Sequence, residues 1–156
     1  MNLEKKIARL LIRQQKTLAI AESCTGGLLS HRLTNISGSS QFFKLGVIAY
    51  SNEFKSKILK ITPQTLRQHG AVSVEVVQGM AQAIRRVAKT DLGIAITGIA
   101  GPTGGTKNKP VGMVYLAVAT SRRVIGLKCL LKGSRLEIKK QATTCALKVL
   151  EQLLQK

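Results

Sequence analysis

Apolar residues recur along the chain with two different spacings, one typical of helices and one of buried strands. Leu3, Ile7 and Leu10 follow the helical spacing and predict an amphipathic helix over residues 3–14. Residues 92–97 are instead a nearly continuous apolar run, which is typical of a strand that is buried on both faces. Capping residues, prolines and glycines mark the other elements. Further helices are expected over residues 25–34, 52–59, 63–70, 74–87 and 134–155, and further strands over residues 17–21, 44–51, 111–120 and 124–131.

The order of these elements predicts an α/β fold, a three-layer α/β/α sandwich with a mixed sheet of about five strands. Strands that alternate with helices favour parallel pairing. Only residues 121–123 separate the last two strands, which is close enough for an antiparallel hairpin. The sequence shows no internal repeat or low-complexity segment. At 156 residues, the chain is expected to form a single domain over residues 1–156.

The charge balance is the most unusual bulk property. Lysine and arginine number 25 against 7 aspartate and glutamate residues, which gives a formal net charge of +18. Such a balance suggests nucleic-acid binding, but the basic residues are spread along the chain and aromatic residues make up only 3%. Solvated basic faces are the favoured interpretation, and nucleic-acid binding is kept as an alternative. A basic surface would also attract a small anionic substrate.

Neither a membrane segment nor a disulfide framework is expected. The longest apolar runs, such as residues 111–119, are far shorter than the roughly 20 residues of a membrane-spanning helix, and the first residues lack the apolar block of a signal peptide. Cys24, Cys129 and Cys145 are odd in number and lack C-x-x-C spacing, so reduced thiols are expected. The sequence therefore predicts a soluble, cytoplasmic protein without membrane contact.

Two common types of hydrolytic site are disfavoured by the residues that are missing. Asp91 is the only aspartate, His31 and His69 are the only histidines, and no G-x-S-x-G turn presents a serine, which disfavours a Ser-His-Asp triad. No H-E-x-x-H motif or carboxylate cluster offers a metal site, and neither a dinucleotide fingerprint nor a P-loop is present. The glycine-rich loop after residue 97 fits an anion-binding nest and a flexible crossover equally well.

The stretch AESCTGG, at residues 21–27, follows a predicted strand and begins a predicted helix. It offers three nucleophiles, Ser23, Cys24 and Thr25, and the helix N-terminus makes Cys24 the most reactive of them on paper. No His and Asp arrangement stands nearby in the sequence to activate them. The favoured interpretation is that the turn binds substrate phosphate or stabilises an oxyanion. Exchange of Cys24 for serine is then expected to preserve most activity.

A lysine base is the third candidate for the chemistry. Lys55 falls in the first turn of a predicted helix, where its ammonium faces the positive end of the helix dipole and neighbouring lysines add like charge. A neutral lysine can take a proton from a serine, with Tyr50 relaying or stabilising it. The nearest upstream hydroxyls are those of Ser39 and Ser40, in a glycine turn. The alternative, which the local sequence favours, is an ordinary turn and an exposed lysine.

Six motifs occur in order over nearly the whole chain and together resemble the C-terminal domain of the CinA family of competence/damage-inducible proteins. They are AESCTGG at 21–27, GSSQFF at 38–43, G-x-I-x-YSN-x-x-K at 46–55, HGAVS at 69–73, TGIAGPTGG at 97–105 and KPVG at 109–112. The resemblance implies a stand-alone form of that domain. The other half of CinA, associated with ADP-ribose pyrophosphatase activity, is expected to be absent.

The resemblance implies an amidohydrolase. The family is associated with nicotinamide-nucleotide amidase activity, in which nicotinamide mononucleotide and water give nicotinate mononucleotide and ammonia. Carried over by motif, Ser40 is the expected nucleophile, with Ser39 left open, and Tyr50 and Lys55 are the activating pair. No metal or other cofactor is implied. Two other hypotheses are a DNA-binding protein linked to competence or damage, and a relative that binds the nucleotide without turnover.

The resemblance also implies contacts to the substrate from both glycine-rich segments and from one arginine. Arg135 falls where the family usually has G-D-R, and it is expected to grip phosphate as a fork. Two departures from the family pattern, Ser134 and Lys139, lie on this anion-binding side. A homo-oligomer is expected, with a dimer favoured. The expected substrate-binding residues are Glu22, Ser23, Thr25, Gly26, Gly27, Thr97, Gly98, Gly101 and Arg135.

Overall fold

The computed structural model describes residues 2–155 and confirms the predicted order of helices and strands. Its helices are α1 (Leu3–Arg13), α2 (Leu28–Thr34), α3 (Asn52–Leu59), α4 (Pro63–His69), α5 (Val74–Ala88) and α6 (Arg135–Leu154). Its strands are β1 (Leu18–Glu22), β2 (Phe43–Ile48), β3 (Leu92–Gly98), β4 (Met113–Ala119) and β5 (Val124–Leu130). A short 3-10 helix, η1 (Ser39–Gln41), precedes β2 where the sequence indicated only a turn.

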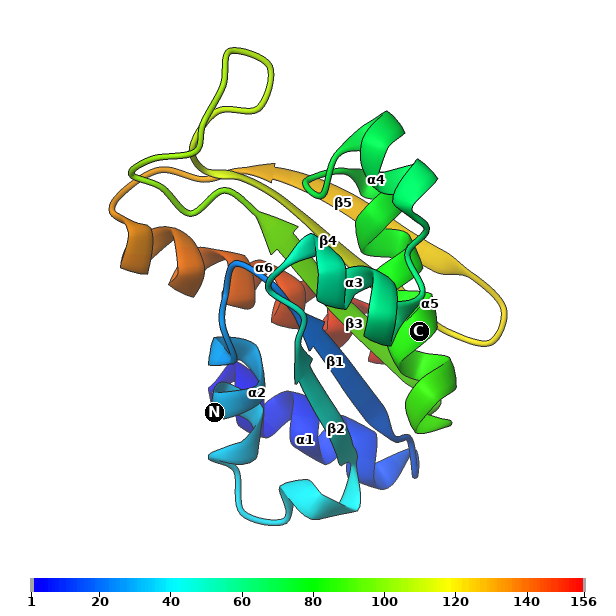
Figure 1. Ribbon diagram of the computed structural model, residues 1–156. Coiled ribbons are helices and arrows are strands. Elements are labelled where there is room, and N and C mark those ends of the chain that lie inside the picture. Colours follow the sequence, from blue (N-terminus) through cyan, green and yellow to red (C-terminus); the bar gives the residue numbers. More distant parts are fainter. Residues whose placement is uncertain (1, 156) are drawn as a thin grey trace.

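The strands form one mixed sheet in the order β2-β1-β3-β4-β5. β1 pairs in parallel with β2 and with β3, whereas β4 is antiparallel to β3 and β5 is antiparallel to β4. From β1 the chain moves outward to β2 and then crosses back to β3, with α2 and α5 on opposite faces of the sheet (Figure 1). Such a reversal opens a crevice at the carboxyl ends of the central parallel strands.

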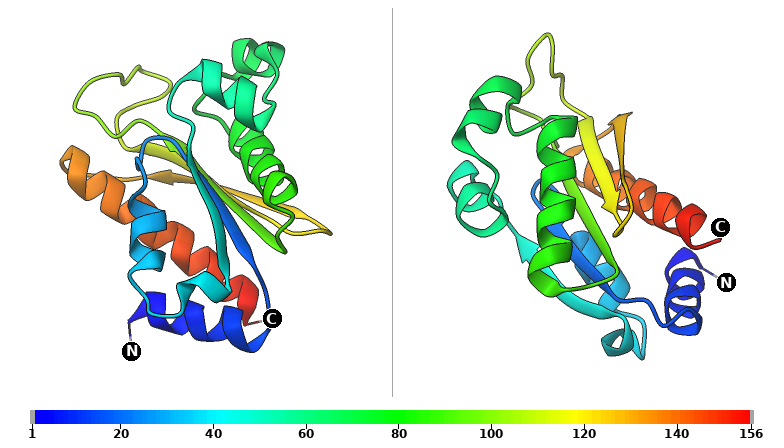
Figure 2. Two further views of the ribbon diagram at one scale, coloured as in Figure 1. Left: turned by 60° about the horizontal axis from the view of Figure 1, so that its bottom comes forward. Right: turned by 90° about the vertical axis from the view of Figure 1, so that its right-hand side faces the viewer.

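Helices cover both faces of the sheet, which confirms the three-layer sandwich (Figure 2). One core lies between the sheet and α1, α2 and α6, and the other lies between the sheet and α5 with its neighbours α3 and α4. β1 shows the alternation, because Leu18 and Ile20 belong to the first core and Ala19 and Ala21 to the second. Both faces of β1 are therefore buried, as in other central parallel strands.

Polar side chains cap the first turns of several helices in the way that the sequence predicts. The hydroxyls of Ser51, Thr62 and Ser73 accept hydrogen bonds from backbone N–H groups in the first turns of α3, α4 and α5. Ser134 and Glu137 form a capping box at the start of α6. Ser134 thus serves as a helix cap, a role that the family's aspartate would serve equally well.

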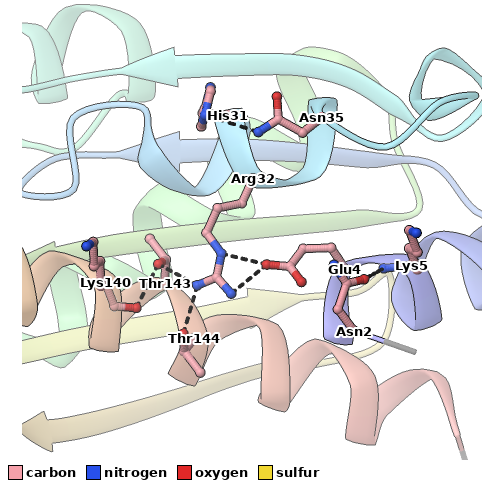
Figure 3. A network of polar contacts seen from close by, with 9 residues as sticks. All are labelled: Asn2, Glu4, Lys5, His31, Arg32, Asn35, Lys140, Thr143 and Thr144. Atoms are coloured by element: carbon pink, nitrogen blue, oxygen red, sulfur yellow. Dashed lines mark hydrogen bonds and ion pairs between the residues drawn. The ribbon is translucent and has the colours of Figure 1, made fainter.

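Arg32 ties three helices together on the face opposite α5 (Figure 3). From α2, its Nε donates to Glu4 Oε1 on α1 at 2.8 Å. Its Nη1 donates to the hydroxyls of Thr143 and Thr144 on α6, each at 2.8 Å. The guanidinium therefore fixes the position of α2, and with it the turn that leads from β1 into α2.

Two further expectations concern membranes and thiols. None of the helices within residues 2–155 is long and apolar enough to cross a bilayer. Cys24, Cys129 and Cys145 are all free thiols, as predicted. Cys24 is buried and the other two are partly buried, so all three act as packing residues in this fold.

Candidate active site

A cavity of about 270 Å³ lies at the carboxyl ends of β1 and β3. Its walls come from the turn between β1 and α2, the start of α3, the glycine-rich loop after β3 and the first residue of α6. The cavity therefore lies at the chain reversal where open α/β sheets bind ligands. The polar side chains that line it include Ser23, Tyr50, Asn52, Lys55, Thr97 and Arg135.

Glu22, the last residue of β1, organises the turn that leads into α2. Its side chain is fully buried, and Oε2 accepts hydrogen bonds from the Thr25 hydroxyl at 2.6 Å and from the N–H groups of Gly27 and Leu29 at 3.1 Å. Oε1 accepts from the N–H and the hydroxyl of Ser30, both at 2.8 Å. A carboxylate of the protein thus occupies the positive end of α2.

The N–H groups at the start of α2 are consequently unavailable to a substrate phosphate, contrary to the expectation from the sequence. Gly26 and Gly27 have φ values of +60° and +96°, which glycine adopts without strain, and they shape the turn. Neither of them lines the cavity, and neither do Glu22 or Thr25. Of the expected binding residues in this turn, only Ser23 faces the cavity.

Lys55 is a buried lysine without a charged partner. It is 2% exposed, and its Nζ donates to Ser23 Oγ at 2.9 Å and to the carbonyl oxygens of Ala49 and Tyr50, both at 3.0 Å. All three acceptors are neutral, and within residues 2–155 no carboxylate lies within ion-pair distance of this amine. The contact between Ser23 and Lys55 joins the end of β1 to the first turn of α3.

Burial lowers the pKa of Lys55 below its ordinary value of 10.5, because the charged form loses its hydration. The direction is as expected from the sequence, but the cause is different. Neighbouring lysines were expected to supply like charge, yet Lys57 pairs with Glu53 and Lys44 donates to the carbonyl of Ser40. A lysine that loses its proton readily beside a serine hydroxyl is suited to deprotonate that hydroxyl.

Cys24 lies beside this pair but is not activated. It is 6% exposed, and burial raises the pKa of its thiol to about 11, with the Glu22 carboxylate adding to the rise. The sequence alone suggested that the helix N-terminus lowers this pKa, but burial outweighs the effect of the backbone N–H, and Glu22 already occupies that end of the helix. The thiol therefore stays protonated at neutral pH, which agrees with the prediction that Cys24 is not the nucleophile.

Ser40 lies at the opposite end of the sheet. It belongs to η1, directly before β2, whereas Tyr50 and Lys55 follow β2 (Figure 1). The six residues of β2 span roughly 20 Å, which is far beyond hydrogen-bond reach. The expectation that the glycine turn brings Ser40 or Ser39 beside Lys55 is therefore wrong. Ser23 occupies that position instead.

Tyr50 and Arg135 form the solvent-facing side of the cavity. The Arg135 guanidinium donates from Nη2 to the Tyr50 hydroxyl at 2.9 Å and from Nη1 to the Gly101 carbonyl at 2.7 Å. Tyr50 meets Lys55 only through its backbone carbonyl, so its hydroxyl is not placed to relay a proton to that amine. Arg135 is exposed at the cavity, where an anion can reach it.

The end of β3 and the loop after it supply another wall. Thr97, Gly98 and Gly101 all line the cavity. The Thr97 hydroxyl donates to the Ala71 carbonyl at 3.0 Å and so holds the residues before α5 against the end of β3. Asn52 also lines the cavity, and sequence reasoning missed it. Its signal was its place as the first residue of a helix that follows a parallel strand.

The chemical groups that face the cavity define what it can do. Among residues 2–155, no three His, Cys, Asp or Glu side chains lie where they could hold a metal ion. The cavity instead offers a hydroxyl, an amine that readily gives up its proton and a guanidinium. This set is suited to acyl transfer by a serine nucleophile on a substrate that carries an anionic group.

The sequence model of the CinA C-terminal domain matches residues 1–154, and the chain therefore belongs to this family. A curated relative from Moorella thermoacetica is 50% identical over 148 residues, which is 95% of this chain. Another from Thermoanaerobacter sp. (strain X514) is 45% identical over 152 residues, which is 97% of this chain. Both carry the provisional name competence-damage inducible protein. The chain spans only 36% and 37% of the length of these relatives.

Solved structures agree with the family assignment. A CinA superfamily protein from Klebsiella pneumoniae has a TM-score of 0.94 at 34% identity, with 99% of this chain and 98% of that chain covered. A competence or damage-inducible protein from Enterobacter asburiae also has a TM-score of 0.94, at 36% identity, with 97% and 96% covered. These matches confirm the α/β architecture and cover nearly all of the chain.

Proposed function

We propose that this chain is an amidohydrolase that converts nicotinamide mononucleotide and water to nicotinate mononucleotide and ammonia. The observation that carries the proposal is the 2.9 Å contact between Ser23 Oγ and the buried Lys55 Nζ, in a cavity that Arg135 also lines. A serine activated by a lysine attacks acyl carbons without needing a metal. The resemblance of the sequence motifs to the nicotinamide-nucleotide amidase family supplies the identity of the substrate.

The reaction begins when Lys55 accepts the proton of the Ser23 hydroxyl as Oγ attacks the carboxamide carbon. The tetrahedral intermediate expels ammonia, which takes up the proton from Lys55, and leaves an ester on Ser23. A water molecule, deprotonated by the same amine, then hydrolyses the ester to a carboxylate and restores the hydroxyl. We assign the oxyanion to the N–H of Cys24, which follows the nucleophile and is not bound by Glu22.

Arg135 is the group proposed to bind the substrate phosphate. Its guanidinium is held at the cavity by Tyr50 and Gly101, and a guanidinium can bind phosphate through two parallel hydrogen bonds. The cavity of about 270 Å³ is small for a ligand site, which favours a mononucleotide over a dinucleotide. The wall formed by Thr97 and Gly98 then faces the ring end of the substrate.

The test is to measure ammonia and nicotinate mononucleotide after incubation with nicotinamide mononucleotide, nicotinamide riboside or nicotinamide. We expect turnover of the mononucleotide, and a kcat/KM about 10- to 100-fold lower for the riboside because it lacks the phosphate. Arg135→Ala should remove that difference, whereas Arg67→Ala, a matched loss of an exposed arginine on α4, should keep it. Binding of the mononucleotide without any ammonia would identify a relative that lacks turnover and would overturn the proposal.

A further inference from the structure

A second cavity, of about 700 Å³, lies at the other end of the sheet from the candidate active site. It opens where β1 and β3 begin and where the hairpin between β4 and β5 turns, next to the last residues of α5 and α6. In Figure 1 this is the end at which α5 finishes and the hairpin (yellow) reverses. Its lining includes Lys16, Arg85, Asp91, Arg122, Arg123 and Leu153.

Four cationic residues from three separate segments line this cavity. Lys16 precedes β1, Arg85 comes from the last turn of α5, and Arg122 and Arg123 form the hairpin turn. Within residues 2–155 none of them has a carboxylate within ion-pair distance. We name this group of four residues the basic cavity. Like charges that share one cavity repel one another, and an anion bound between them would remove that cost.

Asp91 is the one carboxylate among the lining residues that the structure describes, and it does not neutralise the basic cavity. Asp91 Oδ2 accepts hydrogen bonds from the N–H of Thr17 at 2.7 Å and from its hydroxyl at 2.8 Å. These bonds, the backbone N–H first, hold the pKa of Asp91 below its ordinary value, and the charge of Lys16 adds to the effect. Asp91 thus anchors the start of β1 to the start of β3 and leaves four positive charges facing one negative charge.

Local contacts hold the backbone of the segments that carry the cations. In the hairpin, the N–H of Thr120 donates to the Arg123 carbonyl at 2.8 Å, and the Thr120 hydroxyl accepts from the N–H groups of Arg122 and Arg123 at 3.2 and 3.1 Å. The stem of Arg85 packs on β3, since a Cβ at Gly93 would lie 2.7 Å from the Arg85 Cβ. Binding therefore needs little further ordering of the backbone, whereas the exposed side chains of Arg122 and Arg123 become ordered when the ligand binds.

We propose that the basic cavity binds a compact polyanion, a small molecule with two or more adjacent phosphate groups. Each of the three guanidinium groups can donate paired hydrogen bonds to the oxygens of a phosphate, and the lysine adds a point charge. The volume falls within the range of small-molecule sites. No aromatic side chain lines the cavity to stack on bases, which favours this ligand class over single-stranded nucleic acid. The site is independent of the proposed amidase activity.

The test is isothermal titration calorimetry of the whole chain with inorganic pyrophosphate, repeated at a higher salt concentration. We expect saturable binding to one site per chain that weakens as salt increases. The variant Arg122→Ala/Arg123→Ala should bind pyrophosphate at least about tenfold more weakly. The control variant Lys5→Ala/Arg9→Ala removes the same amount of charge from α1 and should change the affinity by less than about twofold. Thermal melts of both variants check that they remain folded.

Three outcomes would overturn the proposal. The first is an absence of saturable binding by the folded wild type. The second is an equal loss in both double variants, which would assign the binding to net charge alone. The third is a loss in Arg135→Ala, which would move the pyrophosphate to the candidate active site. Binding of a single-stranded oligonucleotide that Arg122→Ala/Arg123→Ala abolishes, with no binding of pyrophosphate, would identify the site as a nucleic-acid surface instead.

Discussion

Two serine-bearing turns flank the neighbouring strands β1 and β2, and they differ in which end of the sheet they occupy. Ser23 follows β1 and lies 2.9 Å from the buried amine of Lys55. Ser40 precedes β2, is exposed, and offers its carbonyl to Lys44. Because the two strands are parallel, a residue after one strand and a residue before the other lie at opposite ends. The position of a serine relative to its strand, rather than its closeness in sequence to Lys55, therefore decides which serine contacts Lys55.

Exchanging each serine in turn tests most directly which of the two is the nucleophile. Ser23→Ala should lower kcat for amide hydrolysis about a thousandfold or more, because it removes the proposed nucleophile. Ser40→Ala is the matched control and should stay within about twofold of wild type, since its side chain reaches no part of the cavity. Ammonia release measures both. Equal rates in wild type and Ser23→Ala would remove Ser23 from the mechanism.

The two lysines near these serines give the second test. Lys55→Met should lower kcat about a thousandfold, because no other amine within residues 2–155 contacts Ser23 Oγ, while a side chain of similar length keeps the packing. Lys44→Met removes the lysine next to the other serine turn and should leave kcat nearly unchanged. The assay is again ammonia release, with circular dichroism to compare the folds. Full activity in Lys55→Met would contradict a lysine base.

The Glu22 carboxylate, which organises the turn between β1 and α2, is expected to stabilise the fold. Glu22→Gln should destabilise the fold by about 2 kcal/mol, because the buried side chain accepts five hydrogen bonds that an amide cannot all accept. Glu53→Gln, at an exposed ion pair with Lys57, should change the stability by less than about 0.5 kcal/mol. Urea unfolding measures both. If the two variants were equally stable, Glu22 would not be the organiser of the turn.

The pH dependence of kcat/KM tests whether Lys55 is the base. Burial lowers the pKa of Lys55, and only the neutral amine accepts a proton. Below that pKa, kcat/KM should fall about tenfold per pH unit, and above it the rate should level off. The inflection should lie below 10.5, the ordinary value for lysine, and Lys44→Met should keep it in place. A rate that falls as the pH rises toward that inflection would have the opposite sign and would exclude Lys55 as the base.

The smallest effect is expected at the residue beside Ser23. Cys24→Ser should keep kcat within about threefold of wild type, because a thiol whose pKa is raised to about 11 contributes little thiolate at neutral pH. Treatment of the wild-type protein with iodoacetamide near neutral pH should label this buried thiol slowly. Rapid labelling together with inactivation would contradict the expectation and would make Cys24 a competitor of Ser23.

The sequence predicted the fold better than it predicted the site, for a physical reason. The order of elements follows from periodicity and caps, such as Ser73 before α5, which depend on residues a few positions apart. The contact between Ser23 and Lys55 joins residues 32 positions apart and exists only once β1 and β2 lie side by side. The partners of Glu22 lie only 3 to 8 positions further along the chain, but the sequence does not show that this side chain turns back to bind them, so they seemed free to bind a phosphate.

Other residues that line the cavity were expected from the motifs that resemble the family. Thr97 and Gly98 end β3, a run whose burial on both faces the sequence indicated, and both line the cavity. Arg135 was expected from the family motif and lines it too. The lowered pKa of Lys55 was expected for a different reason, since burial and not neighbouring charge causes it. Burial of a single long side chain cannot be seen from local sequence.

The neutral surroundings of Lys55 have a thermodynamic consequence for substrate and proton. Its three acceptors carry no charge, so protonation places an uncompensated cation in the cavity. The pyridinium ring of the proposed substrate is also a cation, and the two repel. Ring and proton then bind antagonistically, and each weakens the affinity of the other by the same factor. Substrate binding should therefore release protons from the enzyme, in an amount that depends on the buffer pH.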